Sequence, residues 1–186
     1  MVLGLVCVWL TVRQNLWCWP TGLIQVALYM EIFREAKLYS DVILNGIFVV
    51  LQIYGWYHWL GGGDRKTELK VTRLTDIDLA AWMIIGFALT LAWGYVMQHF
   101  TDAAAPYPDA FILIMSLIAQ WLMALKKLPS WYFWIAVDIT AIGLYYYKQL
   151  YMTSCLYMAF LGLATLGYME WKQSMRTGVS GVPVEG

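Results

Sequence analysis

Long apolar blocks separated by short polar loops are the feature that most limits what this chain can fold into. Of its 186 residues, 61% are hydrophobic and 13% are charged, whereas a soluble domain carries about 25% charged residues. A helix crosses the hydrocarbon core of a bilayer with about 20 apolar residues, and most of the blocks approach that length. The sequence therefore predicts an all-α polytopic membrane protein.

Seven blocks are predicted to be transmembrane helices. They cover residues 1–12, 17–33, 38–60, 79–100, 110–125, 131–147 and 150–171. The first is short, because it rises only about 18 Å as a helix, and it has neither the basic start nor the cleavage site of a signal peptide. Outside the blocks, residues 61–78 are expected to form a solvated cytoplasmic loop and residues 172–186 a flexible polar tail.

An internal repeat relates the two ends of the chain. Shifting the sequence by 112 positions aligns identical residues of the third and seventh blocks, namely Leu38 with Leu150, Tyr39 with Tyr151, Leu44 with Leu156, Phe48 with Phe160, Gly55 with Gly167 and Trp59 with Trp171. Upstream of these blocks, Trp17 and Trp19 correspond only loosely to Trp131 and Trp134. The third and seventh blocks are therefore predicted to be equivalent helices.

The repeat and the number of blocks define the expected layout. Residues 1–60 and 110–171 would form two three-helix bundles in parallel orientation, joined by a linker transmembrane helix over residues 79–100. Repeats of this kind are typical of transporters, and enzymes and structural proteins seldom need them.

Basic residues are distributed unequally between the two sides of the predicted membrane protein. With seven spans, nine Lys and Arg residues fall on the side of the C-terminus, and three, Arg34, Lys37 and Lys148, fall on the other. Cytoplasmic loops are the ones enriched in basic residues. The N-terminus is therefore expected outside the cell and the C-terminus in the cytoplasm.

Three polar residues share one face of the third block. Asp41 and Asn45 are four residues apart and Asn45 and Gln52 seven, so a helix stacks all three, with Phe48 between them. Polar side chains at membrane depth are costly unless they face protein or water. Contact between helices would explain one such residue, whereas three on one face favour a lined pathway.

The fifth and sixth blocks add polar groups near the same depth. By helix rise, Gln52 and Gln120 lie about 16 Å into the bilayer and Asp138 about 10 Å in from the other face. A carboxylate at such a depth marks a functional site by default. Trp131 and Trp134 share its helical face, and indole rings beside a carboxylate suit a flat cationic aromatic ring that carries hydroxyl groups. Trp131 follows a basic loop and could equally belong to the interfacial aromatic belt.

Motifs of other functional classes are missing from the sequence. Cys7, Cys18 and Cys155 lie in apolar blocks without pairing or ligand spacing, so they are expected to be inert thiols. His58 and His99 are far apart and have no carboxylate at metal-ligand spacing, so we predict neither a metal site nor a cofactor. A basic face for nucleic acid, a Ser/His/Asp set and a phosphate-binding loop are also missing.

Several runs resemble the PnuC-type vitamin transporters, namely NLWCWPTGLI, KLYSD, QIYGWYHW, PDAFILIMSLIAQWLMALKKLPSWYFWIAVDI and SCLYMAFLGLATLGYMEW. The resemblance covers nearly the whole chain, and the combination of QIYGWYHW with WYFWIAVD is quite specific. It implies a bacterial inner-membrane protein with a three-plus-one-plus-three helix fold, like that of a SWEET sugar transporter, assembled as a homotrimer. It also implies facilitated diffusion of nicotinamide riboside, or in related branches of thiamine, riboflavin or deoxynucleosides, with intracellular phosphorylation trapping the vitamin. The family's WxxW motif, which helps to form its binding site, falls on Trp131 and Trp134.

The residues and the resemblance together predict a uniporter for nicotinamide riboside. Trp131 and Trp134 would flank the pyridinium ring, while amide and carboxylate groups would bind the ribose and the carboxamide. The predicted binding residues are Asn45, Gln52, Tyr57, Gln120, Trp131, Trp134 and Asp138. Thiamine, another cationic aromatic molecule with a hydroxyl group, is the alternative substrate. A membrane-embedded enzyme would need a nucleophile or a metal near Asp138, and a non-transporting scaffold would have no use for that carboxylate.

Overall fold

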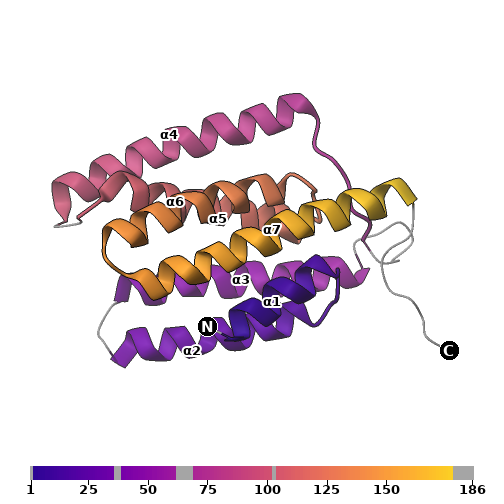
Figure 1. Cartoon of the computed structure of the whole chain (residues 1–186), viewed down its shortest axis with the longest axis horizontal. Coiled ribbons are helices and arrows are strands. Elements are labelled where there is room, and N and C mark those ends of the chain that lie inside the picture. Colours follow the sequence, from indigo (N-terminus) through magenta and orange to yellow (C-terminus); the bar gives the residue numbers. More distant parts are fainter. Residues whose placement is uncertain (1, 36–38, 62–68, 102–103, 178–186) are drawn as a thin grey trace.

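The computed structural model describes residues 2–35, 39–61, 69–101 and 104–177, with the side chains of residues 29, 32–35 and 39–44 outside the description. Seven α-helices lie in these ranges, as predicted, and run roughly along the long axis of the molecule (Figure 1). They are α1 (Val2–Val12), α2 (Cys18–Glu35), α3 (Tyr39–Gly61), α4 (Asp76–Phe100), α5 (Pro106–Ala124), α6 (Ser130–Tyr147) and α7 (Tyr151–Thr177).

Several helix ends depart from the prediction because local capping overrides the hydropathy pattern. α4 begins at Asp76, before its apolar block, since the Thr75 Oγ1 accepts a 3.1 Å hydrogen bond from the Asp78 N–H. α5 begins at Pro106, also early, because proline suits the first turn of a helix. α7 continues to Thr177, so the first residues of the expected flexible tail are helical.

Three of the described helices, α4, α5 and α7, are long and apolar enough to cross a membrane on their own. α1 and residues 18–28 of α2 are apolar but shorter. Large apolar side chains also remain exposed along α4, among them Ile84, Phe87 and Tyr95. An extended apolar surface of this kind would be a liability in water. These features are those of a polytopic membrane protein.

Six of the helices close a ring, and α4 lies outside it. Around the ring α1 packs against α2, α2 against α3, α3 against α5, α5 against α6, α6 against α7 and α7 against α1. α4 packs against α5 and forms one edge of the molecule in Figure 1. Contacts between the first three helices and the last three therefore run through two seams, α1 with α7 and α3 with α5.

The internal repeat is also visible in the backbone conformation of equivalent turns. Gln14 and Lys126, which are 112 positions apart, both have positive φ angles, of 54° and 52°. Each follows the end of its helix, and the N–H of each bonds the carbonyl three residues earlier, at 3.0 Å from Thr11 and 2.9 Å from Met123. The α1–α2 and α5–α6 turns are thus built alike.

Candidate functional site

Residues of all six ring helices line a cavity of about 290 Å³. α2 contributes residues spaced three and four apart, Cys18, Trp19, Gly22, Gln25 and Val26, which is one face of a helix. Ligand pockets in proteins measure about 300–1,000 Å³, so this cavity has room for one small organic molecule. Among the described residues, no group of three or more His, Cys, Asp or Glu side chains could hold a metal ion.

Six of the seven predicted binding residues face this one cavity. They are Asn45, Gln52, Gln120, Trp131, Trp134 and Asp138. Phe48 lies between Asn45 and Gln52 on the same stripe of α3 and also lines the cavity. The helical spacing that suggested a lined pathway therefore places these residues along one wall of the cavity, to which α5 and α6 add the other polar groups.

Tyr57 does not join the other predicted residues. It is 78% exposed and is not among the residues that line the cavity. It lies five positions after Gln52, which turns it about 140° away from the stripe around the helix axis. The side chain of Asp41, the third polar residue predicted for this stripe, lies outside the described side chains.

Asp138 is the only charged residue among the described residues that line the cavity. It lies in the middle of α6 and is 4% exposed. No described residue donates a hydrogen bond to its carboxylate or forms an ion pair with it. A buried carboxylate without a partner is costly when ionised, and a cation or a hydrogen-bond donor entering the cavity would relieve that cost.

Four tryptophans form a buried layer at one end of the cavity, which we call the tryptophan end. Trp19 and Trp131 line the cavity, and Trp59 and Trp171 lie behind them. The rings of Trp19 and Trp59 meet edge to face at 5.2 Å, and those of Trp131 and Trp171 do the same at 5.4 Å. Trp131 is 1% exposed, so its alternative assignment to an interfacial belt is wrong.

Comparison with known proteins gives the family of the chain. Residues 1–173 match the family described as nicotinamide mononucleotide transporter. The chain belongs to this family. A match over nearly all of the described residues makes the protein a membrane transporter rather than an enzyme.

Individual proteins are similar to this chain over most of its length. The nicotinamide riboside transporter PnuC of Escherichia coli strain K12 is 24% identical over 200 residues, which cover 94% of this chain and 84% of that protein. PnuC of Neisseria mucosa is 27% identical, with 94% and 71% covered. The riboflavin/roseoflavin transporter RibM of Streptomyces davaonensis is 24% identical, with 98% and 88% covered. A crystal structure of the vitamin B3 transporter PnuC matches with a TM-score of 0.72 at 26% identity, covering 96% of this chain and 80% of that one.

In this family member the two repeats supply the cavity with equivalent positions but different chemistry. Eight pairs of lining residues are 112 positions apart, namely Val8/Gln120, Thr11/Met123, Trp19/Trp131, Gly22/Trp134, Val26/Asp138, Asn45/Tyr157, Phe48/Phe160 and Gln52/Ala164. The cavity is therefore centred between the repeats. The carboxylate comes from the second repeat and most of the amides from the first, so the two ends of a ligand would meet different groups.

Several lining residues escaped the sequence analysis. Gln25 is a polar residue on the cavity face of α2, and its isolation in the apolar run from Leu23 to Leu28 was an available signal. Trp19 was matched only loosely to the second repeat, but the offset of 112 pairs it with Trp131. The edge-to-face contacts of both rings show that this correspondence holds in space. Tyr157 is the equivalent of Asn45 and could have been found from the same offset.

Proposed function

We propose that the protein takes up nicotinamide riboside by facilitated diffusion, with later intracellular phosphorylation trapping the vitamin. The observation that carries this proposal is the buried carboxylate of Asp138, which has no described partner and faces the same cavity as Trp131 and Trp134. A pyridinium ring would supply the missing positive charge and stack on an indole face. Amides of Asn45 and Gln52 would bind the ribose hydroxyls and the carboxamide.

The charge of the cavity favours the riboside over its phosphorylated form. None of the described lining residues is Lys or Arg, and a phosphate group normally requires such a partner or a helix N-terminus. Next to Asp138, a phosphate would also be repelled. The family description names the mononucleotide, whereas the cavity suits the nucleoside without its phosphate.

The charge and the size of the cavity also rank the other vitamins as substrates. The relative RibM is a riboflavin/roseoflavin transporter, but riboflavin is a larger, three-ring molecule without a positive charge. A cavity of about 290 Å³ lies at the lower limit of the usual range and holds an acidic group. Thiamine is the second candidate, because Asp138 would attract its cationic ring as well as it attracts a pyridinium ring.

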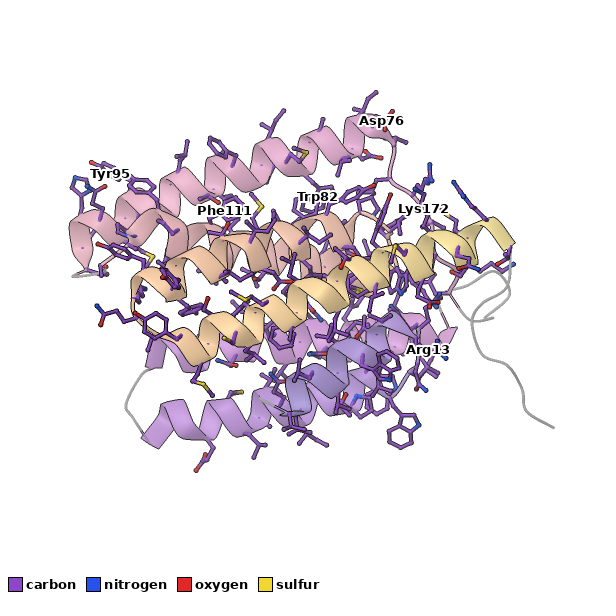
Figure 2. All side chains as sticks on the ribbon, in the orientation of Figure 1. Arg13, Asp76, Trp82, Tyr95, Phe111 and Lys172 are labelled. Carbon is purple, nitrogen blue, oxygen red and sulfur yellow. The ribbon has the colours of Figure 1, made fainter. Side chains whose placement is uncertain are left out.

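Transport would proceed by rocking of the first three helices against the last three, as in other repeat transporters. The tryptophan end carries the basic residues Arg13 and Lys172 (Figure 2), and by the distribution of basic loops this end would face the cytoplasm. Of the described helices, α4 packs closely against α5 only. Most of its remaining surface is exposed. The helix would link the two three-helix bundles and face lipid or neighbouring subunits of a homotrimer in the bacterial inner membrane.

Isothermal titration of the purified protein in detergent tests the substrate. We expect heat of binding with nicotinamide riboside, weaker or no binding of riboflavin, and none of nicotinamide mononucleotide; thiamine decides between the two cationic candidates. Asp138→Asn should weaken binding of the cation at least about tenfold, since a charge-assisted contact is worth about 1.5–3 kcal/mol. Asp76→Asn, which removes an exposed carboxylate from the start of α4, is the matched control. Unchanged affinity in Asp138→Asn would refute the proposed role of the carboxylate.

A further inference from the structure

Of the side-chain hydrogen bonds that join the repeats at the tryptophan end, two have an indole donor; a third, from Gln14 Nε2 to Ser174 Oγ at 2.9 Å, lies nearer the surface. The Trp59 Nε1–H of α3 donates to the Met123 carbonyl of α5 at 3.1 Å. The Trp171 Nε1–H of α7 donates to the Thr11 carbonyl of α1 at 3.0 Å. Both donors and both acceptors are 112 positions apart, so the two bonds are equivalent by the repeat. They bridge the two seams of the ring, one bond in each.

The indoles of these two donors also meet each other. The rings of Trp59 and Trp171 lie 5.7 Å apart at an angle of 57°, and both are fully buried. Because neither lines the cavity, they form a second layer behind Trp19 and Trp131. A molecule that leaves the cavity through this end would meet them after Trp19 and Trp131.

Contacts within each repeat are of a different kind from those across the seams. A Cβ atom at Gly55 would overlap the six-membered ring of Trp19, and one at Gly167 would lie 2.7 Å from Trp131 Cε2. Each indole is therefore seated directly on the backbone of its own repeat, Trp19 on α3 and Trp131 on α7. Parting the repeats would leave these close contacts intact and break the two indole–carbonyl bonds.

The closed arrangement also leaves two donors unsatisfied. The Nε1 atoms of Trp19 and Trp131 are buried and have no hydrogen-bond partner among the described residues. A buried donor without a partner opposes the state that contains it. In the first repeat the N–H of Trp59 favours closure and that of Trp19 opposes it. In the second, Trp171 and Trp131 play the same two parts. The opposing pair limits the stability of the closed state, so that it can still open.

We propose that the two indole–carbonyl bonds and the Trp59–Trp171 contact form the gate that closes the tryptophan end of the cavity. Opening separates Trp59 from Met123 and Trp171 from the α1 carbonyl together, while the Trp19 and Trp131 rings move with their own repeats. The gate rests on the transport role proposed above, but it does not depend on which vitamin is carried.

A native thiol reports on this gate without any substrate. Cys18 lines the cavity beside Trp19 and is buried. In a Cys7→Ser/Cys155→Ser background it is the only cysteine of the three in the chain. Its rate of modification by a cationic, membrane-impermeant methanethiosulfonate would be measured in right-side-out and inside-out membrane vesicles. Each orientation presents one end of the cavity to the reagent.

Trp59→Phe removes the N–H donor and keeps an aromatic ring, although a smaller one, and Trp171→Phe makes the equivalent change in the other repeat. We expect either variant to raise the rate of Cys18 modification from the tryptophan end about fivefold, which corresponds to the loss of one hydrogen bond. The double variant should raise it about 25-fold if the bonds act independently. Trp82→Phe, on α4 outside the ring, is the matched control and should change nothing.

Unchanged rates in both variants, or an equal rise from both faces, would overturn the gate, because the latter indicates general loosening. If one variant does not reach the membrane, the other makes the same test through the repeat. The result is separable from the substrate assignment. If Cys18 is modified faster from one face but no vitamin binds, the gate proposal stands and the substrate assignment is refuted. If a vitamin binds but the modification rates do not change, only the gate proposal is refuted.

Discussion

Replacing Gly22 by alanine should displace the amide of Gln52 from the cavity. A Cβ atom at residue 22 would overlap Gln52 Nε2 and would lie 2.9 Å from both Cδ and Oε1. Cβ atoms do not approach other heavy atoms this closely, so the side chain of Gln52 must turn away. The bare backbone of α2 at Gly22 is therefore what allows an amide of α3 to occupy this part of the cavity.

The structure separates the effect on binding from the effect on stability. The displaced atoms are the free end of a flexible side chain, and alanine is favoured over glycine in a helix by about 1 kcal/mol. We therefore expect the thermal stability of Gly22→Ala to stay near that of the wild type. The affinity for nicotinamide riboside should fall by about fivefold to 30-fold, the loss of one or two hydrogen bonds of about 1 kcal/mol each.

A double-mutant cycle makes this reasoning refutable. If Gly22 acts only through Gln52, Gly22→Ala should weaken binding in the wild-type background and not in Gln52→Ala. Gln52→Asn, which is shorter by one methylene group, should restore part of the affinity lost in Gly22→Ala. Gly46→Ala on α3, where a Cβ would meet nothing within 4 Å, is the control. Equal losses in both backgrounds, measured by titration calorimetry, would show that Gly22 contributes in some other way.

Three further substitutions test the rest of the structure. Gly55→Ala should destabilise the protein by about 1–3 kcal/mol in thermal unfolding, since its Cβ would overlap a rigid indole, whereas Gly143→Ala has open space and should not. Asp138→Asn should raise the unfolding temperature while weakening cation binding, because it removes a buried carboxylate without a described partner. Lys148 Nζ contacts both carboxylate oxygens of Asp109 at 2.9 and 3.1 Å, so Lys148→Met should cost up to about 1 kcal/mol of stability, and adding Asp109→Asn should recover part of it.

Helical periodicity explains why much of the cavity could be predicted from the sequence. Asn45, Phe48 and Gln52 are spaced three, four and seven apart, and this spacing alone places them on one face of α3. A polar face on an apolar helix must meet other polar groups or a cavity, and both depth estimates and spacing led from there to Gln120 and Asp138. Tyr57 does not face the cavity, because it is five positions after Gln52 and therefore points about 140° away from the stripe around the helix axis.

Contacts that depend on the meeting of distant segments could not be predicted in the same way. The indoles of Trp59 and Trp171 donate to carbonyl groups 64 and 160 positions away in the chain, and no local pattern encodes a backbone acceptor. The repeat was nevertheless a usable guide. Applied strictly at 112 positions, it pairs Trp19 with Trp131 and Trp17 with Pro129, so only Trp19 has an equivalent tryptophan.

The repeat is kept at some positions and broken at others, and the division follows the function we propose. At the tryptophan end the tryptophans and the glycines against which they pack are identical in the two halves, with Trp59 and Gly55 matched by Trp171 and Gly167. Equivalent bonds let both seams part together when the halves rock. Within the cavity, by contrast, the position equivalent to Asp138 is held by an apolar residue, Val26. A symmetric cavity would hold an unsymmetrical nucleoside equally well in two orientations, and placing the carboxylate in one repeat alone selects one of them. Moving that charge, with Val26→Asp and Asp138→Val together, should retain the gate measured through Cys18 while changing which substrate orientation binds.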